Sequence, residues 1–373
     1  MRSHPLFRWT AEFAAAATLT FALAACGGGN SATGVSSGST PTTSATVEQV
    51  STVAGSTQWG ATNGPVASAK FNDPCDVAVD AAGNIYVDDT GNHLIRKIDT
   101  NGNVTTVAGA GTGGNVDGNG VAAKFDFPNG FTLDSSGNLY VADSGNNTIR
   151  KIDTSGNVTT FAGSSASGSA NGRGTAASFN FPAGIVIDPS GNLFVADDGN
   201  NLIRKIDPSG NVTTFAGSGA QGSANGLGTA ASFNAPHGIV LDASGNLYVA
   251  DGGNNVIRKI DPSGNVTTLA GSGAQGAANG KGTAASFNKP DGVAVDASGN
   301  VYVADTGNNL IRKIDSMGNV TTLAGSGAQA LTNGQGTAAA FYSPEGLTVD
   351  AAGNVYVADT LNNAIRKIVA THS

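Results

Sequence analysis

The chain contains very little cysteine and histidine. Its 373 residues include 2 cysteines and 4 histidines. Cys26 belongs to the N-terminal leader region, which leaves only Cys75 in the globular part, so no intrachain disulfide is available there to stabilise the fold. Two of the histidines, His4 and His372, lie at the ends of the chain. A zinc site built mainly from histidines is therefore not expected.

Charge is also scarce, and it is negative overall. Charged residues make up 12% of the chain, and 27 acidic against 19 basic residues give a net charge of −8. An acidic surface is a poor partner for phosphate backbones, so we expect no nucleic-acid binding. Two G-x-G-x-x-G segments, Gly217–Gly222 and Gly271–Gly276, follow strands but precede no amphipathic helix, so we expect no nucleotide binding either.

Long apolar runs are absent as well. The longest one, from Phe13 to Ala25, follows Arg2 and Arg8 and is too short to cross a bilayer about 30 Å thick. It ends in Leu23-Ala24-Ala25-Cys26-Gly27, which resembles the signal of bacterial lipoproteins. That resemblance implies cleavage before Cys26 and lipidation of its thiol, giving a stable membrane anchor. An ordinary secretory signal is the alternative.

The N-terminal region therefore predicts export and tethering. Residues 1–25 are the expected lipoprotein signal peptide, and residues 26–46 are the lipidated cysteine and a flexible tether of Gly, Ser and Thr. We expect an extracytoplasmic protein of the bacterial cell envelope, attached to the membrane through its lipid. Because Gly27 replaces the aspartate that signals retention in the inner membrane, the outer membrane is favoured where a cell has two.

One unit of 54 residues repeats six times through residues 47–373. The repeat is visible in an Arg-Lys pair, an aspartate and a phenylalanine that recur with this spacing. The arginines are Arg96, Arg150, Arg204, Arg258, Arg312 and Arg366; the aspartates are Asp80, Asp134, Asp188, Asp242, Asp296 and Asp350; the phenylalanines are Phe71, Phe125, Phe179, Phe233, Phe287 and Phe341. A period of this size, rich in short strands and turns, indicates a propeller or a repeat array.

Each unit contains four β-runs separated by Gly, Asn and Pro turns, as residues 236–270 illustrate. The last unit stops after its third run, whereas Val50–Gly55 matches the text of a fourth run. The N-terminal strand should therefore complete the last unit and close a ring. The predicted fold is all-β: a six-bladed β-propeller of four-stranded antiparallel blades, whose last blade is closed by the N-terminal strand.

The repeated text Pro-x-Gly, Asp-x-x-Gly-Asn, Tyr-Val-Ala-Asp and Asn-Asn-x-Ile-Arg-Lys-Ile resembles the NHL repeat in all six units. That resemblance implies a propeller used mostly as a binding platform, with enzymes as a minority. Residues present in all six copies are interpreted as structural. The phenylalanines should wedge between blades, and the aspartates should fasten turns. One member of each Arg-Lys pair should bind a nearby aspartate, and the other should be solvated.

The positions at which the six copies differ are the candidates for function. The residue after the proline of each unit should lie at one mouth of the central channel. We call these six positions the mouth ring: Cys75, Asn129, Ala183, His237, Asp291 and Glu345. Asp76 also replaces the glycine that follows in the other units. Trp59, in the first inter-blade loop, is a further candidate for ligand binding, although it could equally be buried packing.

Four members of the mouth ring form a mixed oxygen and nitrogen donor set: Asn129, His237, Asp291 and Glu345. Such a set suits Ca²⁺ or another divalent cation. The Pro128-Asn129-Gly130 and Pro290-Asp291-Gly292 segments resemble metal-binding stretches of gluconolactonase propellers, which implies a divalent ion that polarises a lactone. The alternatives left open are a catalytic metal site, a non-catalytic ligand site and a solvated rim; no cofactor is firmly implied.

The sequence as a whole predicts a monomeric, membrane-tethered platform that binds an envelope protein or a glycan at the channel mouth. The rival interpretation is a metal-dependent hydrolase of lactonase type, or a lyase, with its site at the same mouth.

Overall fold

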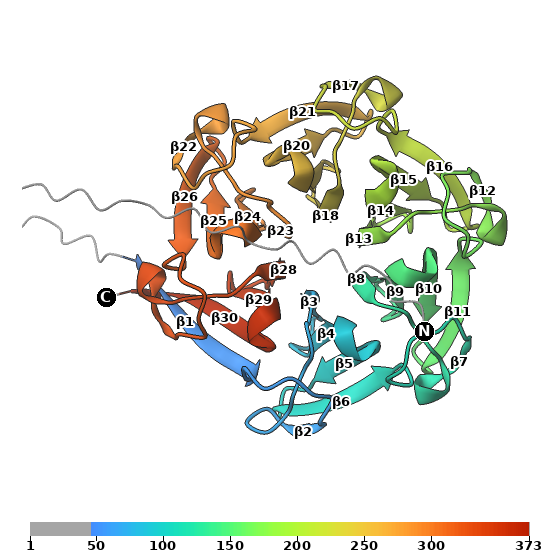
Figure 1. The fold of residues 1–373 in the computed structure, drawn as a ribbon, viewed down its shortest axis with the longest axis horizontal. Coiled ribbons are helices and arrows are strands. Elements are labelled where there is room, and N and C mark those ends of the chain that lie inside the picture. Colours follow the sequence, from blue (N-terminus) through green and yellow to red (C-terminus); the bar gives the residue numbers. More distant parts are fainter. Residues whose placement is uncertain (1–45, 373) are drawn as a thin grey trace, which may run out of the picture. The chain divides into compact units, whose positions relative to one another are not determined.

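The computed structural model describes residues 46–372, which form six five-stranded antiparallel sheets arranged around a central axis (Figure 1). The innermost strands are β3 (Asp76–Val79), β8 (Pro128–Leu133), β13 (Pro182–Ile187), β18 (Pro236–Leu241), β23 (Val293–Val295) and β28 (Pro344–Val349). The second strands are β4 (Ile85–Asp89), β9 (Leu139–Asp143), β14 (Leu193–Asp197), β19 (Leu247–Asp251), β24 (Val301–Asp305) and β29 (Val355–Asp359).

The outer strands continue the same order away from the axis. The third strands are β5 (Leu94–Ile98), β10 (Thr148–Ile152), β15 (Leu202–Ile206), β20 (Val256–Ile260), β25 (Leu310–Ile314) and β30 (Ala364–His372). The fourth are β6 (Asn103–Ala108), β11 (Asn157–Ala162), β16 (Asn211–Ala216), β21 (Asn265–Ala270), β26 (Asn319–Ala324) and β1 (Thr46–Gly55). We number the blades 1 to 6 in the order of their innermost strands.

Short 3-10 helices make the turns. Between second and third strands lie η1 (Thr90–Asn92), η3 (Ser144–Asn146), η5 (Asp198–Asn200), η7 (Gly252–Asn254), η9 (Thr306–Asn308) and η11 (Thr360–Asn362). The inter-blade loops contain η2 (Gly120–Ala122), η4 (Gly174–Ala176), η6 (Gly228–Ala230), η8 (Gly282–Ala284) and η10 (Gly336–Ala338). Within residues 46–372, no helix is long and apolar enough to cross a bilayer.

The prediction of four strands per blade was wrong, because each blade has five. The additional strands contain two residues each: β2 (Gly64–Pro65), β7 (Gly118–Asn119), β12 (Gly172–Arg173), β17 (Gly226–Leu227), β22 (Gly280–Lys281) and β27 (Gly334–Gln335). Each pairs with the start of the fourth strand of the blade that follows it; in blade 2, Gly118 faces Val158. These pairs lie in loops of Gly and polar residues, where no alternation of apolar side chains marks a strand.

Closure of the ring by the N-terminal strand is confirmed. β1 pairs antiparallel with β30, with Val50 opposite Ile368, and so becomes the fourth strand of blade 6. Val50 is fully buried in the apolar cluster of that blade. The two ends of the propeller therefore hold one another in a single sheet, in which β1 covers the outer edge of β30.

Apolar packing between neighbouring blades forms the core. The six repeated phenylalanines are fully buried. Phe179 is typical, because it packs with Tyr140 and Ile149 of blade 2 and with Val195 of blade 3. The prediction that these residues wedge between blades is confirmed, and the core is distributed over the blade interfaces.

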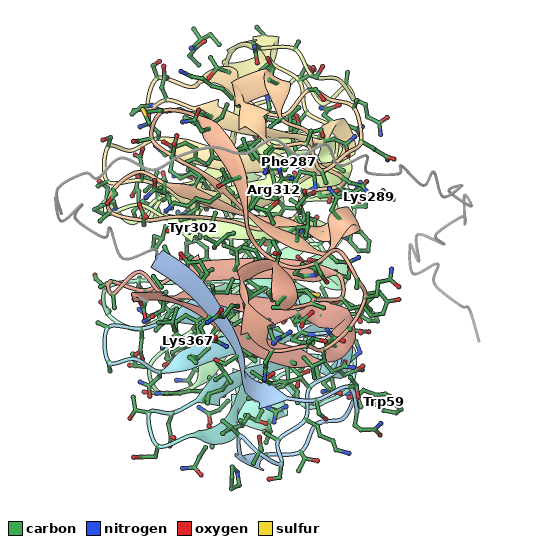
Figure 2. All side chains as sticks on the ribbon, turned by 90° about the vertical axis from the view of Figure 1, so that its left-hand side faces the viewer. Trp59, Phe287, Lys289, Tyr302, Arg312 and Lys367 are labelled. Carbon is green, nitrogen blue, oxygen red and sulfur yellow. The ribbon has the colours of Figure 1, made fainter. Side chains whose placement is uncertain are left out.

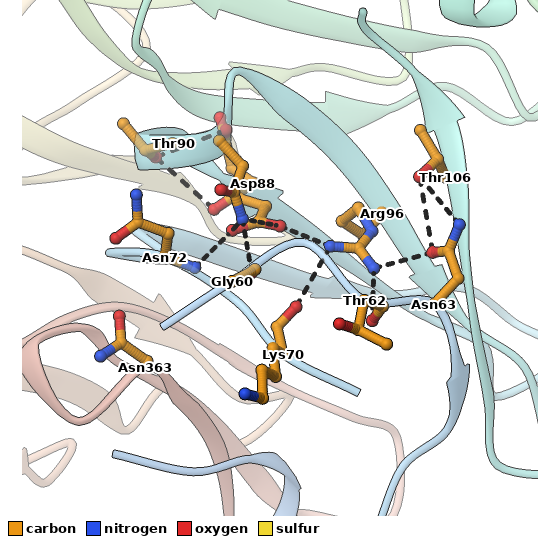
Figure 3. A network of polar contacts seen from close by, with 12 residues as sticks. Gly60, Thr62, Asn63, Lys70, Asn72, Asp88, Thr90, Arg96, Thr106 and Asn363 are labelled. Atoms are coloured by element: carbon orange, nitrogen blue, oxygen red, sulfur yellow. Dashed lines mark hydrogen bonds and ion pairs between the residues drawn. The ribbon is translucent and has the colours of Figure 1, made fainter. Parts of the chain in front are cut away.

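Each repeated arginine is buried in an ion pair that fixes the inter-blade loop. In blade 4, Arg258 Nη1 lies 2.8 Å from Asp251 Oδ2, and both side chains are fully buried. The guanidinium also donates to Ala224 O and Asn225 Oδ1, each at 2.9 Å. Figure 3 shows the equivalent contacts of Arg96 in blade 1. The pair thus connects two strands with the loop that leads into the blade.

The remaining repeated charges are also structural. Lys259 Nζ lies 5.6 Å from the centre of the Tyr248 ring, and the same cation–π contact recurs in every blade. Asp134 Oδ1 accepts hydrogen bonds from the backbone N–H groups of Ser136 and Asn138, both at 2.9 Å. The aspartates of the first turn are therefore turn fasteners, as predicted.

The expected signal peptide, Cys26 and the tether up to residue 45 lie outside the described residues.

Candidate functional site

The six blades bring six non-equivalent side chains to one end of the central channel. Each innermost strand starts at this end, and each turn between the second and third strands lies on the same face, because the strands of a blade alternate in direction. The innermost strands surround the axis in Figure 1. The mouth ring is therefore a ring in space as well as in the repeat.

The backbone before each mouth-ring proline is held in an unusual conformation. The six preceding residues have φ between 46° and 51°, in the left-handed region: Asp73, Phe127, Phe181, Ala235, Lys289 and Ser343. In blade 4, the Ala235 N–H donates to Asn201 Oδ1 of blade 3 at 3.0 Å. Such a conformation is costly for residues other than glycine, and the hydrogen bond from the neighbouring blade stabilises it. These residues therefore fix the backbone position from which each mouth-ring side chain extends.

His93 belongs to this frame and not to the mouth. It takes the place of the asparagine in blade 1, and its Nδ1 accepts a hydrogen bond from Phe127 N at 3.0 Å. Burial lowers the pKa of His93, against the opposing effect of Asp126. A neutral imidazole with its proton on Nε2 leaves Nδ1 able to accept the hydrogen bond from Phe127 N.

Glycines bring the blades close together immediately below the mouth ring. A Cβ atom added to Gly238 would lie 2.4 Å from Asp291 O, and one added to Gly184 would lie 2.4 Å from His237 O. Gly238 N also donates to Asp291 O at 2.9 Å. Five blades pack in this way, whereas blade 1 has Asp76 at the position.

The innermost strands enclose a cavity with a volume of about 280 Å³. Its walls include Cys75, Asn129, His237 and Asp291 of the mouth ring, and also Asp76. Deeper along the channel the lining is mainly apolar, with Val79, Leu133, Val186 and Val240 among its residues. A polar mouth above an apolar channel suits a ligand that enters from one face.

His237 and Asp291 form the strongest interaction at the mouth. His237 Nδ1 lies 2.9 Å from Asp291 Oδ1, and the two side chains are 22% and 23% exposed. Burial alone would lower the pKa of His237, but Asp291, assisted by Asp198 and Glu345, outweighs it and raises the pKa to about 10. His237 is therefore an imidazolium at neutral pH, in contact with Asp291.

Two further carboxyl groups surround this pair. Burial raises the pKa of Glu345 to about 8, and the charge of Asp291 adds to the effect. Burial raises the pKa of Asp198, at the start of η5, to about 6, although His237 opposes the change. Glu345 is therefore mainly a neutral acid at pH 7, able to donate a hydrogen bond to a ligand. Asp198 stands where the other blades have serine, threonine or glycine, a difference visible in the aligned repeats.

Cys75 is next to Glu345 in the ring, and its thiol donates a hydrogen bond of 3.4 Å to Asp73 O. Burial and the Glu345 carboxyl raise the pKa of the Cys75 thiol well above its usual range. A thiol in this environment is neither a good nucleophile nor a ready metal ligand. Cys75 contributes shape and a weak hydrogen bond to the mouth.

The structure brings three of the four predicted metal ligands to one side of the ring. His237, Asp291 and Glu345 come from the consecutive blades 4, 5 and 6, whereas Asn129 comes from blade 2, opposite Asp291. Within residues 46–372, no three His, Cys, Asp or Glu side chains are arranged to hold a metal ion. As arranged, with His237 paired to Asp291, the donor set does not fit the divalent cation of the gluconolactonase resemblance.

Asp76 lines the cavity one residue beyond the mouth ring, and it has a partner that sequence reasoning missed. Burial raises the pKa of Asp76 to about 7, against the backbone N–H groups of Phe131 and Val77. Directly opposite on the neighbouring strand lies Asp88, which is fully buried. The signal that identifies it is the repeat itself, because the other five units have alanine at this position.

Trp59 is exposed, with 72% of its surface accessible, so it is not buried packing. It lies on the same face of the propeller as Lys289, which precedes a mouth-ring proline (Figure 2). Phe181, at the equivalent position before Pro182, is 58% exposed. The face that carries the mouth therefore exposes aromatic side chains, which are common in recognition surfaces.

Comparison with protein families agrees with this architecture. Residues 13–220, more than half of the chain, match the model described as SMP-30/Gluconolactonase/LRE-like region. Residues 233–260, 287–314 and 341–368 match the NHL repeat. The chain belongs to the SMP-30/gluconolactonase/LRE-like family and carries NHL repeats, as a six-bladed β-propeller.

Individual relatives extend the comparison. The chain is 32% identical over 282 residues to Protein SUPPRESSOR OF QUENCHING 1, chloroplastic, of Arabidopsis thaliana, with 70% of this chain but 27% of the relative covered. An auxiliary nutrient binding protein from Bacteroides thetaiotaomicron has a TM-score of 0.68 at 18% identity, covering 87% and 77% of the two chains. Virginiamycin B lyase from Staphylococcus aureus has a TM-score of 0.51 at 14% identity, covering 80% and 95%. These two likenesses show the fold alone.

Proposed function

We propose that the protein is a membrane-tethered, extracytoplasmic propeller that acts as a monomeric platform and binds an envelope protein or a glycan at the channel mouth. One observation carries the proposal. The six repeats are almost the same, yet the residue after the proline is different in every repeat. Packing would be served equally well by one residue type at all six positions, as it is for the phenylalanines.

The chemistry of the mouth suits a polar, hydroxylated or peptide ligand. The His237–Asp291 pair supplies charged hydrogen-bonding groups, and Glu345 supplies a neutral acid at neutral pH. Trp59 and Phe181 are exposed on the face that carries the mouth, and they offer apolar surfaces for a sugar ring or a side chain. The fold is shared with a nutrient binding protein of a Bacteroides species, which supports a binding role.

The proposed location rests on the sequence before residue 46. The Leu23–Gly27 segment resembles a lipoprotein signal, and lipidation at Cys26 would hold the propeller at the surface of the bacterial envelope. Metabolic labelling with a fatty acid tests this: label is expected on the wild-type chain and lost from Cys26→Ser. Equal labelling of the two chains would contradict the anchor.

Binding is tested by comparing three forms of the full chain on arrays of envelope glycans and purified envelope proteins. The forms are wild type, the double variant His237→Ala with Glu345→Ala, and Met317→Ala as a control. Met317 is 68% exposed in a turn on the opposite face. We expect the wild type and the control to bind the same ligand and the double variant to lose at least tenfold in affinity; equal binding by all three would refute the assignment.

A second candidate function is a hydrolase or lyase with its site at the same mouth. The observation that favours it is the group of shifted carboxyls, since Glu345 and Asp76 have raised pKa values of the kind found in acid–base catalysis. The family also includes gluconolactonase-like propellers. Metal analysis of the purified chain and assays of lactone hydrolysis with added Ca²⁺ or Zn²⁺ separate the two candidates, because turnover lost in Glu345→Gln would favour the enzyme.

A further inference from the structure

Blade 1 differs from every other blade at two positions that face each other. Asp76 stands where five blades have glycine, and Asp88 stands where the same five have alanine. The two residues are directly opposite in the register of β3 and β4. This places their Cβ atoms about 5 Å apart on one face of the sheet. The face meets blade 2, since Asp76 Oδ2 accepts a hydrogen bond from Phe131 N of β8 at 3.1 Å.

The two carboxyl groups have unequal surroundings. Asp76 Oδ1 accepts a second hydrogen bond, from Val77 N at 2.8 Å, so both oxygens of Asp76 face backbone donors. Asp88 is fully buried, its Oδ2 has no hydrogen-bond partner, and its Oδ1 has only a contact of 3.5 Å with Thr90 Oγ1. N–H donors stabilise a carboxylate, whereas a buried carboxyl without them is stable only as the neutral acid.

Within residues 46–372, no arginine or lysine forms an ion pair with either carboxyl group. Asp89 and Asp143 approach Asp88 from its own strand and from blade 2, and each is committed to a buried arginine, Arg96 at 2.6 Å and Arg150 at 2.8 Å.

The groups that face Asp76 from the other blades do not supply a counterion either. They are Asp291 of blade 5 and His237 of blade 4, which already pair with each other. Glu345 of blade 6 lies beside Cys75 and is itself an acid. Among the described residues, neither Asp76 nor Asp88 has a basic partner within ion-pair distance.

We propose that Asp76 and Asp88 form a proton-binding pair in the seam between blades 1 and 2, in which Asp88 remains a carboxylic acid at neutral pH and loss of protons from the pair weakens the seam. Asp76 is the member that carries negative charge first, because it has the backbone donors. Asp76 also lines the channel, so the protonation of the pair changes the charge of the mouth.

The direction of the pH dependence follows from the buried state. Burial raises the pKa of Asp76 to about 7, and burial together with Asp76 and Asp89 raises the pKa of Asp88 well above its usual range. Unfolded aspartates release their protons near pH 4. The contribution of each raised carboxyl to stability is therefore fully present below pH 4 and is lost as pH rises, for Asp76 up to about pH 7. Each proton changes the unfolding constant by up to tenfold per pH unit.

The repeat itself supplies the test variants, because Asp76→Gly and Asp88→Ala restore the residues of the other five blades. Infrared spectroscopy of the full chain at pH 7 and 8 detects the carbonyl stretch of protonated carboxylic acids. We expect Asp88→Ala to lose one such band and Glu345→Gln to lose a different one. If Asp88→Ala leaves the carboxylic-acid bands unchanged, the proposal is wrong.

Stability provides a second, independent measurement. Between pH 5 and pH 7, the unfolding constant of the wild type in urea should rise at least tenfold more than that of the Asp76→Gly, Asp88→Ala double variant. Asp99→Asn is the matched control, because Asp99 is an exposed turn carboxylate whose hydrogen bonds from Asn103 and Asn101 lower its pKa. This control should keep the steep wild-type dependence. An equal pH dependence in wild type and double variant would overturn the proposal.

Discussion

Replacing Asp291 with asparagine removes the main countercharge of His237 and tests the electrostatics of the mouth. The wild-type pKa of His237 is about 10, against 6.5 for an unperturbed histidine. A difference of about 3.5 pH units corresponds to about 5 kcal/mol. Because both side chains are about a fifth exposed, solvent screening reduces the coupling to roughly 2–3 kcal/mol. We therefore expect Asp291→Asn to lower the pKa of His237 by about two units.

The same shift has a consequence for stability. A histidine whose folded pKa is raised stabilises the folded state fully below its unfolded pKa of about 6.5, and this contribution is lost as pH rises toward 10. The wild type should accordingly lose stability between pH 7 and pH 10, and Asp291→Asn should lose less over that interval.

The assay is NMR titration of the chain labelled at histidine, from pH 5 to pH 10. Wild-type His237 should remain an imidazolium at pH 8, and His93 serves as an internal control that is neutral there, because its Nδ1 accepts a hydrogen bond. In Asp291→Asn, His237 should titrate near or below pH 8. A wild-type midpoint near 6.5, or an unchanged midpoint in the variant, would refute the reasoning.

Three further predictions concern the frame, and urea unfolding or gel filtration checks them. Asp251→Ala leaves the buried guanidinium of Arg258 without its carboxylate and should cost about 3–5 kcal/mol; a loss below 1 kcal/mol would contradict this. Gly238→Ala places a Cβ atom 2.4 Å from Asp291 O and should cost about 1–3 kcal/mol, so a neutral effect would show that the blades separate easily. Deleting residues 47–55 removes β1 and exposes the edge of β30, so the chain should aggregate or dimerise; a stable monomer would argue against closure by this strand.

The repeat made most of the fold predictable. Six copies with the same phenylalanine determine six equivalent interfaces, and the split last unit determines the closing strand, since Val50–Gly55 has the text of a fourth strand. Because the same pattern of strands and turns recurs in each copy, the structure of one unit predicts that of the other five. The fifth strand of each blade could not be predicted. A strand of two residues, such as Gly118 and Asn119, is too short to show an alternation of apolar and polar side chains.

The site was predictable in position but not in contacts. The mouth ring follows from the residue after each proline, yet the 2.9 Å contact of His237 with Asp291 depends on side-chain directions that spacing does not determine. Asp88 was overlooked although its position in the repeat marks it, because its importance depends on the register that places it opposite Asp76. Asn129 has oxygen-donor chemistry like that of the acids, but it lies in blade 2, opposite the blade that carries Asp291.

A single chain thus provides its own comparison between structural and functional positions. At positions 76 and 88, blades 2 to 6 show the small residues that packing requires, whereas blade 1 has an aspartate at each position. Burying the carboxyl groups of Asp76 and Asp88 costs free energy, so packing alone does not explain them. At the mouth ring every blade differs, and the surrounding left-handed residues and glycines keep those differences at fixed places.

The central claim, that the mouth face binds the ligand, is tested most directly by photo-crosslinking in the native envelope. A photoreactive amino acid replaces Phe181, which is exposed on the mouth face, or Met317, which is exposed on the opposite face. We predict a discrete crosslinked product from position 181 that disappears when His237→Ala and Glu345→Ala are added, and none from position 317. A product that is equal from both positions, or that survives the mouth substitutions, would contradict the claim.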